Sequence, residues 1–121
     1  MDNQENNEDL NKYIDIDAAL SRLLGNKAAY KRVLELFLQS NLFAELETVI
    51  SQKNYSKASE IAHGIKGMTG SLGMTILFDE SATLTVQMRA GPPDEQTLKN
   101  YRETLIKTRE YAEKIVEQLT P

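Results

Sequence analysis

The chain has 121 residues, of which 26% are charged and none is cysteine. The absence of cysteine excludes disulfides, thiolate metal sites and cysteine nucleophiles. No apolar run approaches the ~18 residues that a membrane span requires, and no cationic start precedes an apolar stretch as in a secretory signal. The chain also lacks the stripe of basic residues that is typical of nucleic-acid-binding proteins. We therefore expect one cytoplasmic domain that binds neither membrane nor nucleic acid.

The net charge of −4 lies in the N-terminal segment. Residues 1–11 contain four acidic and no basic side chains, and the rest of the chain holds 14 acidic and 14 basic residues. A segment of such composition cannot bury enough apolar surface to fold. We expect residues 1–12 to be a disordered acidic leader and residues 13–121 to be the folded domain.

Helical periodicity dominates the rest of the chain, without the alternation or turn signals of β-hairpins. Five helices are expected, over residues 17–24, 27–52, about 55–72, 75–90 and 95–119. Asp15 or Asp17 would cap the first, and the second would bend near residues 40–41, where helix formers are poor. Apolar stripes and short connections predict an all-α, antiparallel four-helix bundle, with the short first helix across one end.

The only histidine, His63, lies in the glycine-spaced run AHGIKGMTGSLG of residues 62–73. A glycine inside a helix costs roughly 1 kcal/mol relative to alanine, so Gly64, Gly67 and Gly70 together cost on the order of 3 kcal/mol. Whole domains are stable by only about 5–15 kcal/mol. A weakness of this size indicates that the bare backbone serves packing or access.

Helical spacing divides this part of the chain into two faces. The first face is apolar and holds Ala58, Ile61, Ala62, Ile65, Met68, Thr69 and Leu72. The opposite face holds Ser59, His63, Lys66, Gly67 and Gly70. If the apolar face is buried, the imidazole of His63 points to solvent. The bare glycine backbone beside it would then let a flat protein surface approach the ring.

These side chains suit phosphoryl transfer. The unprotonated nitrogen of a neutral imidazole is a nucleophile, and Lys66, one turn further on, can neutralise an incoming phosphoryl group. The chain has no glycine-rich nucleotide loop of the GxGxxG or Walker type, and no acidic cluster for magnesium near the histidine. We therefore expect a phosphoryl carrier without ATP-dependent kinase activity of its own.

The run AHGIKG of residues 62–67, followed by GSLG of residues 70–73, resembles the motif of histidine-containing phosphotransfer (HPt) domains. That motif has a small residue, histidine, any residue, an aliphatic residue, lysine and glycine, then small residues before a second glycine. The resemblance extends over residues 13–119. It implies a four-helix bundle that relays a phosphoryl group between aspartates of response-regulator receiver domains, often from a hybrid histidine kinase.

The resemblance implies a role for each matching residue. His63 would be the phosphoacceptor, and Lys66 would stabilise the phosphoryl group. Gly67 and Gly70 would keep the surface open to the receiver, and Met74 would match an apolar docking contact. The receiver would supply the aspartate and the magnesium ion, so we expect no cofactor or metal in this chain. A monomer suits such a shuttle.

Two positions depart from the family pattern. Gly64 stands where the family usually has threonine or a larger residue, which loosens the helix further. Thr85 stands where the family often has glutamine or glutamate facing the imidazole. Its shorter hydroxyl would orient the ring less firmly, or through water.

Other interpretations of the same residues stay open. Gly67 could serve close helix packing, and Met74 could fill the core. A non-catalytic helical module could use this surface only to bind or sequester a response regulator. A phosphoacceptor arm of a chemotaxis-type kinase would be labelled directly by a kinase, although such arms are normally fused to ATP-binding regions. A metal site is disfavoured, because one histidine and no cysteine leave only carboxylates.

Overall fold

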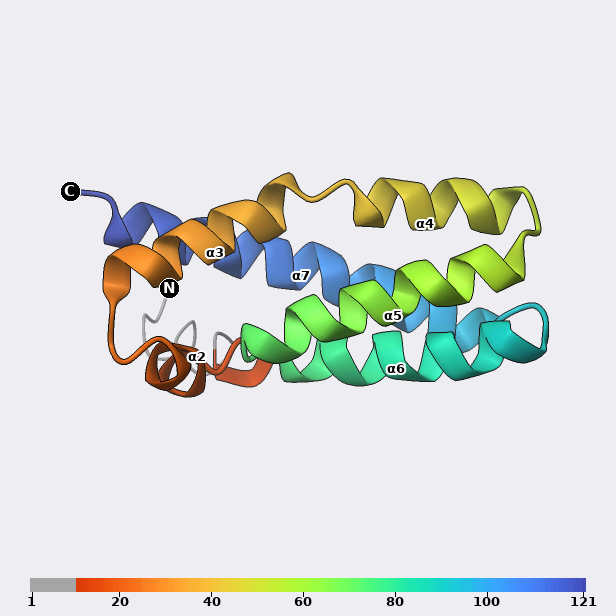
Figure 1. The fold of residues 1–121 in the computed structure, drawn as a ribbon, viewed down its shortest axis with the longest axis horizontal. Helices are drawn as coiled ribbons and strands as arrows, with labels where there is room; N and C mark the ends of the chain where they lie inside the picture. Colours follow the sequence, from red (N-terminus) through yellow and green to blue (C-terminus); the bar gives the residue numbers. More distant parts are fainter. Residues whose placement is uncertain (1–10) are drawn as a thin grey trace, which may run out of the picture.

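The computed structural model describes residues 11–121, which form helices joined by short connections and contain no β-strand (Figure 1). The helices are α2 (Ile16–Arg22), α3 (Lys27–Gln39), α4 (Leu42–Ser51), α5 (Tyr55–Ser71), α6 (Thr75–Ala90) and α7 (Glu95–Leu119). Residues 11–13 are helical as well. The all-α prediction is confirmed, whereas the leader predicted for residues 1–12 lies almost entirely outside the described residues.

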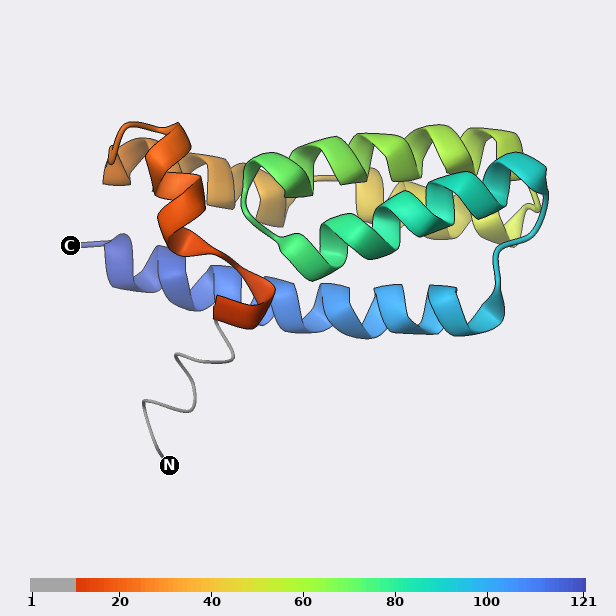
Figure 2. The same cartoon turned by 90° about the horizontal axis from the view of Figure 1, so that it is seen from below.

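α3 and α4 run in the same direction, and each of α5, α6 and α7 reverses the direction of the helix before it (Figures 1 and 2). α3 and α4 follow one another along one side of the molecule, and α5, α6 and α7 run beside them, while α2 lies across one end. The longest helix, α7, has 25 residues. Neither α7 nor any other helix in the described part of the chain is apolar enough over sufficient length to cross a bilayer.

Four helices begin at an Asp or Asn side-chain cap. The carboxylate or amide oxygen of each cap accepts a hydrogen bond from the backbone N–H three residues on, as N-caps do. The four caps are Asp15 (3.0 Å), Asn26 (3.0 Å), Asn54 (3.2 Å) and Asp94 (3.1 Å). The choice between Asp15 and Asp17 is thereby settled in favour of Asp15, and α2 ends at Arg22 rather than at residue 24.

The second predicted helix, over residues 27–52, is two helices rather than one bent helix. Ser40 has extended backbone angles (φ −65°, ψ 135°), so the helical hydrogen-bond ladder stops there. The Ser40 hydroxyl oxygen accepts a hydrogen bond from the Leu42 backbone N–H at 3.2 Å, which satisfies a donor at the start of α4. The expected bend is therefore a complete break, with the Ser40 hydroxyl bonded locally to the chain that begins α4.

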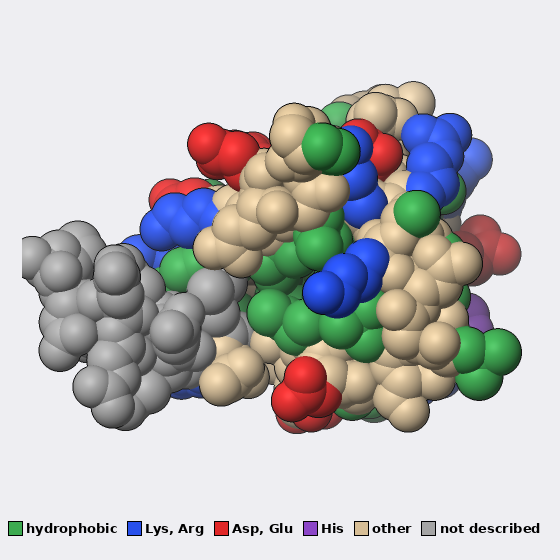
Figure 3. All heavy atoms as spheres, turned by 90° about the vertical axis from the view of Figure 1, so that its left-hand side faces the viewer, with side chains coloured by type: hydrophobic (Ala, Val, Ile, Leu, Met, Phe, Trp, Pro, Cys, Tyr) green, Lys and Arg blue, Asp and Glu red, His purple; other side chains and the backbone are tan. Residues whose placement is uncertain are grey.

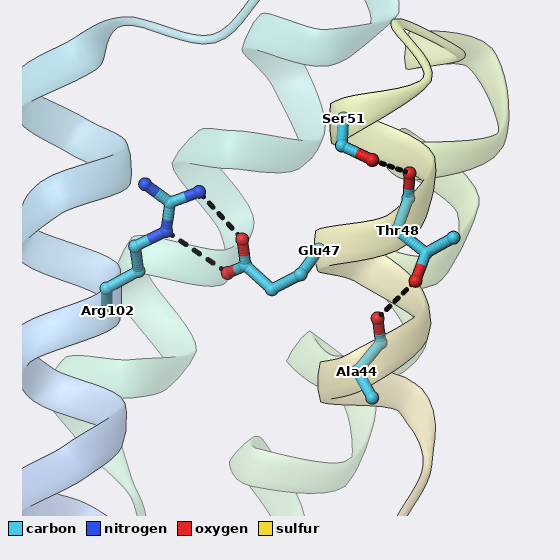
Figure 4. Close-up of polar contacts among 5 residues, drawn as sticks. All are labelled: Ala44, Glu47, Thr48, Ser51 and Arg102. Carbon is cyan, nitrogen blue, oxygen red and sulfur yellow. Dashed lines mark hydrogen bonds and ion pairs between the residues drawn. The ribbon is translucent and has the colours of Figure 1, made fainter.

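The core runs along the interior between the long helices. Its largest fully buried side chains include Tyr30, Leu34, Phe37, Leu46, Ile65, Leu77, Leu84 and Tyr101. On its surface, Arg102 of α7 and Glu47 of α4 form a bidentate ion pair, with the closest approach at 2.7 Å (Figure 4). Both side chains are nearly half exposed, so this pair contributes at most about 1 kcal/mol.

One carboxyl group is partly buried where α6 meets α7. Among the described residues, the Oε1 atom of Glu80 is buried and has no hydrogen-bond partner. Burial raises the pKa of the Glu80 carboxyl, the nearby Thr104 side chain opposes this shift, and the charges of Asp79 and Glu103 add to it. Burial likewise raises the pKa of the Tyr30 hydroxyl to about 12.

Polar contacts fix α2 against the end of α5. The Asp15 backbone N–H donates to the Gly73 carbonyl at 2.8 Å. The Arg22 guanidinium donates to the carbonyls of Gly70 (3.0 Å) and Ser71 (3.3 Å), which lie at the C-terminus of α5, where a cation is stabilising. Gly73 has φ +71°, and a Cβ there would lie 2.5 Å from the Asp15 carbonyl oxygen. A glycine is therefore required at this junction.

Candidate functional site

His63 lies midway along α5, and its side chain is exposed to solvent. Ala62 and Ile65, on the other side of the helix, have no exposed surface. All the positions predicted for the apolar face are buried or half-buried, so the predicted orientation of the imidazole is confirmed. Within residues 11–121, no group hydrogen bonds to the ring, which leaves both nitrogens accessible.

The backbone on one side of His63 is bare. Gly67 is exposed, and a Cβ built on it would meet nothing within 4 Å. A Cβ on Gly64 would make only an ordinary contact of 3.7 Å with Cδ1 of Leu42, at the start of α4. Close helix packing therefore does not explain Gly67, since no neighbouring helix approaches it.

Ser59 does not share the exposed face, contrary to the prediction. Its side chain is buried, and its hydroxyl donates to the Ser56 carbonyl at 2.7 Å. It lies where the start of α5 faces Met88 and Arg89 of α6. Helical spacing gives the side of α5 on which Ser59 lies. It does not show that α6 covers this side at the start of the helix.

Gly70 also has a different role from the predicted one. A Cβ on Gly70 would lie 2.9 Å from Cδ1 and 3.0 Å from Cε1 of Phe78, closer than side chains normally pack. The space where a Gly70 side chain would point is thus occupied by a ring from α6. Gly67 alone keeps the predicted open approach.

Lys66 leans from α5 toward α6. Its Nζ lies 5.6 Å from the centroid of the Phe78 ring, within the range of a cation–π interaction. His63 and Lys66 are three residues apart on one helix, so their Cβ atoms are neighbours at about 5–6 Å. The ammonium group is therefore within a side chain's reach of a group bound to the imidazole.

Met74 and Thr85 are both buried, so neither side chain is presented at the surface beside His63. Met74 is fully buried at the start of α6, so it belongs to the core and presents no surface for docking. The contact of Gly70 with Phe78 sets an antiparallel register that brings Thr85 to the level of His63. Thr85 is nevertheless buried, and its hydroxyl donates to the Ser81 carbonyl at 2.8 Å, so its proton is not offered to the imidazole.

An open groove of about 410 Å³ lies where α2 meets the end of α5 and the start of α6. Its lining includes Ala18 and Phe78 as apolar members, with Asp15, Arg22 and Thr75 as polar members. Figure 3 faces the α2 end of the molecule and shows hydrophobic side chains gathered there with Lys and Arg side chains among them. The groove thus combines apolar area with one carboxylate and one guanidinium group.

Sequence reasoning missed two residues of this region. Phe78 follows the buried Leu77 in α6, and its aromatic ring at this position was the available signal. Arg22 carries a basic side chain in the last turn of α2, but its acceptors on Gly70 and Ser71 are 48 and 49 residues away. No local pattern could have found those partners.

Comparison of the chain with known protein families, curated proteins and solved structures finds no match. The site is therefore interpreted from its own geometry and from the resemblance of its motif. Within the described residues, no three His, Asp or Glu side chains gather in a way that could hold a metal ion.

Proposed function

We propose that this chain is an HPt protein, a phosphorelay intermediate that carries a phosphoryl group on His63 between the aspartates of receiver domains. The observation that carries the proposal is the exposure of His63 one helical turn before Lys66 and the bare backbone of Gly67. A structural histidine has no need of an open approach beside it. A partner that must bring a phosphorylated carboxylate to the ring does need one.

The chemical step requires only a nucleophile in this chain. The unprotonated nitrogen of the neutral imidazole attacks the phosphorus of an aspartyl phosphate, so that a P–N bond forms and the P–O bond to the carboxylate breaks. The carboxylate leaves with the electron pair, and the other ring nitrogen keeps its proton. Lys66 offsets the negative charge of the phosphoryl oxygens. The reverse of this step passes the group to a second aspartate.

The proposal includes a finer architecture and a cellular setting. We assign α3 with α4 as one member of an antiparallel four-helix bundle and α5, α6 and α7 as the other three, with α2 across the end. The partners are receiver domains and a hybrid histidine kinase, and the magnesium ion is the receiver's. The protein acts as a cytoplasmic monomer, which suits a carrier that must meet two partners in turn.

Transfer from a phosphorylated receiver tests the proposal. The wild-type protein is incubated with a receiver carrying ³²P-labelled aspartyl phosphate, and we expect label that is labile in acid and stable in base, as phosphohistidine is. His63→Gln should accept none. Lys57→Gln, an exposed change two turns earlier on α5, is the matched control and should be labelled like the wild type.

The main alternative gives a different pattern. A non-catalytic module that binds or sequesters a regulator would bind the receiver equally well with His63→Gln and would not be labelled in either form. Receiver binding by wild type and variant, measured by calorimetry alongside the labelling, separates the two functions. Labelling of wild type and His63→Gln to the same extent would contradict the proposal outright.

A further inference from the structure

The contact between Lys66 and Phe78 joins the proposed phosphoryl-stabilising residue to the neighbouring helix. The Lys66 Nζ lies 5.6 Å from the ring centroid, and both side chains are half-buried. Within the described residues, Lys66 has no acidic side chain within ion-pair distance; its one charged-group interaction is with this ring. Phe78 is therefore the neighbour that the ammonium group faces in this structure.

Gly70 makes this contact possible. The ring edge of Phe78 lies so close to α5 that a Cβ at position 70 would be 2.9 Å from Cδ1. Any larger residue would push the ring away from the helix and from the ammonium group. Gly70 thus has a role that partner access does not explain.

We propose that Phe78 is a positioning residue that acts through Lys66. The ring keeps the lysine side chain on the α6 side of His63, ready to meet the phosphoryl oxygens, and Gly70 provides the space in which the ring lies. This inference rests on the proposed phosphotransfer function. It adds a residue that touches neither the imidazole nor the phosphoryl group.

The physical reason is the flexibility of lysine. An unrestrained lysine occupies many rotamers, and fixing it beside a charged group loses that entropy. A ring beneath the ammonium group removes many of these rotamers in advance, so less entropy is lost when the phosphoryl group arrives. Because a cation–π contact at a partly exposed site is weak, the ammonium group can leave the ring for the stronger phosphoryl charge.

The test compares Phe78→Leu with Phe78→Tyr. Leucine keeps an apolar side chain but removes the ring, and we expect the transfer rate at saturating receiver to fall about two- to fivefold. Tyrosine keeps the ring and should restore the wild-type rate. Val86→Ala, an exposed change on the same helix, is the control and should change nothing. Gly70→Ala should slow transfer like Phe78→Leu, because it displaces the ring.

A double-mutant cycle with Lys66→Ala separates positioning from general damage to the fold. If Phe78 acts through Lys66, Phe78→Leu slows transfer no further once the lysine is gone. An equal slowing in both backgrounds overturns the proposal, and so does failure of tyrosine to restore the rate. Upfield NMR shifts of the Lys66 ε-methylene protons, lost in Phe78→Leu, give a readout independent of activity.

These outcomes also distinguish this inference from the proposed function. If the wild-type protein is labelled and Phe78→Leu accepts the phosphoryl group at the wild-type rate, the positioning role is overturned and the phosphorelay stands. If the wild-type protein accepts no label although the Lys66 ε-methylene protons show their upfield shift, the phosphorelay is overturned. The positioning role, which rests on it, is then overturned as well.

Discussion

Replacement of Gly67 by alanine should make the protein more stable and less active. Gly67 is inside α5 and exposed, and the added methyl group would meet no atom within 4 Å. Alanine is favoured over glycine in a helix interior by about 0.8–1.0 kcal/mol. We therefore expect the free energy of unfolding to rise by about 1 kcal/mol, and the midpoint of thermal unfolding by roughly 2–8 °C for a domain of this length.

The same methyl group should obstruct the receiver. If the partner packs closely on the bare strip beside His63, one extra carbon must be accommodated at the contact, which costs typically about 1–3 kcal/mol. We expect the receiver concentration for half-maximal transfer to rise at least about fivefold. Urea unfolding followed by circular dichroism measures the stability, and rapid-quench transfer over a range of receiver concentrations measures the activity.

Gly64→Ala is the matched control, because its methyl group would rest on the Leu42 side chain of α4 at 3.7 Å, whereas that of Gly67→Ala would meet no atom. It should gain similar stability and lose less activity. An unchanged or lower stability of Gly67→Ala would refute the inference that the site is open. A gain in stability with unchanged transfer would refute the role of Gly67 in partner access.

Two further substitutions test the junction of α2 and the buried carboxyl. Gly73→Ala should lower the free energy of unfolding in urea by about 2–4 kcal/mol, because it combines a left-handed backbone with a methyl group against the Asp15 carbonyl; near-wild-type stability would contradict this. Glu80→Gln should raise the free energy of unfolding at neutral pH. Because the folded-state pKa of Glu80 is raised, its unfavourable effect develops as pH rises through that pKa and is absent below the unfolded pKa. Unfolding at several pH values should therefore show the gain of Glu80→Gln disappearing near pH 4.

Much of the helical structure follows from local chemistry. The caps Asp15, Asn26, Asn54 and Asp94 each begin a helix because a side-chain oxygen can reach an N–H only three residues away. The break at Ser40 is also local, yet we predicted only a bend there. The strength of a serine cap depends on backbone angles that the sequence does not reveal.

The sequence alone determined that His63 faces outward, because the spacing of apolar residues along α5 decides which side of the helix is buried. The tertiary structure decided what lies beside the imidazole. It left Gly67 open, filled the space over Gly70 with Phe78, and buried Met74. The physical reason is that helical periodicity gives the direction in which a side chain points, whereas its neighbours come from other helices whose position is fixed only when the whole chain packs.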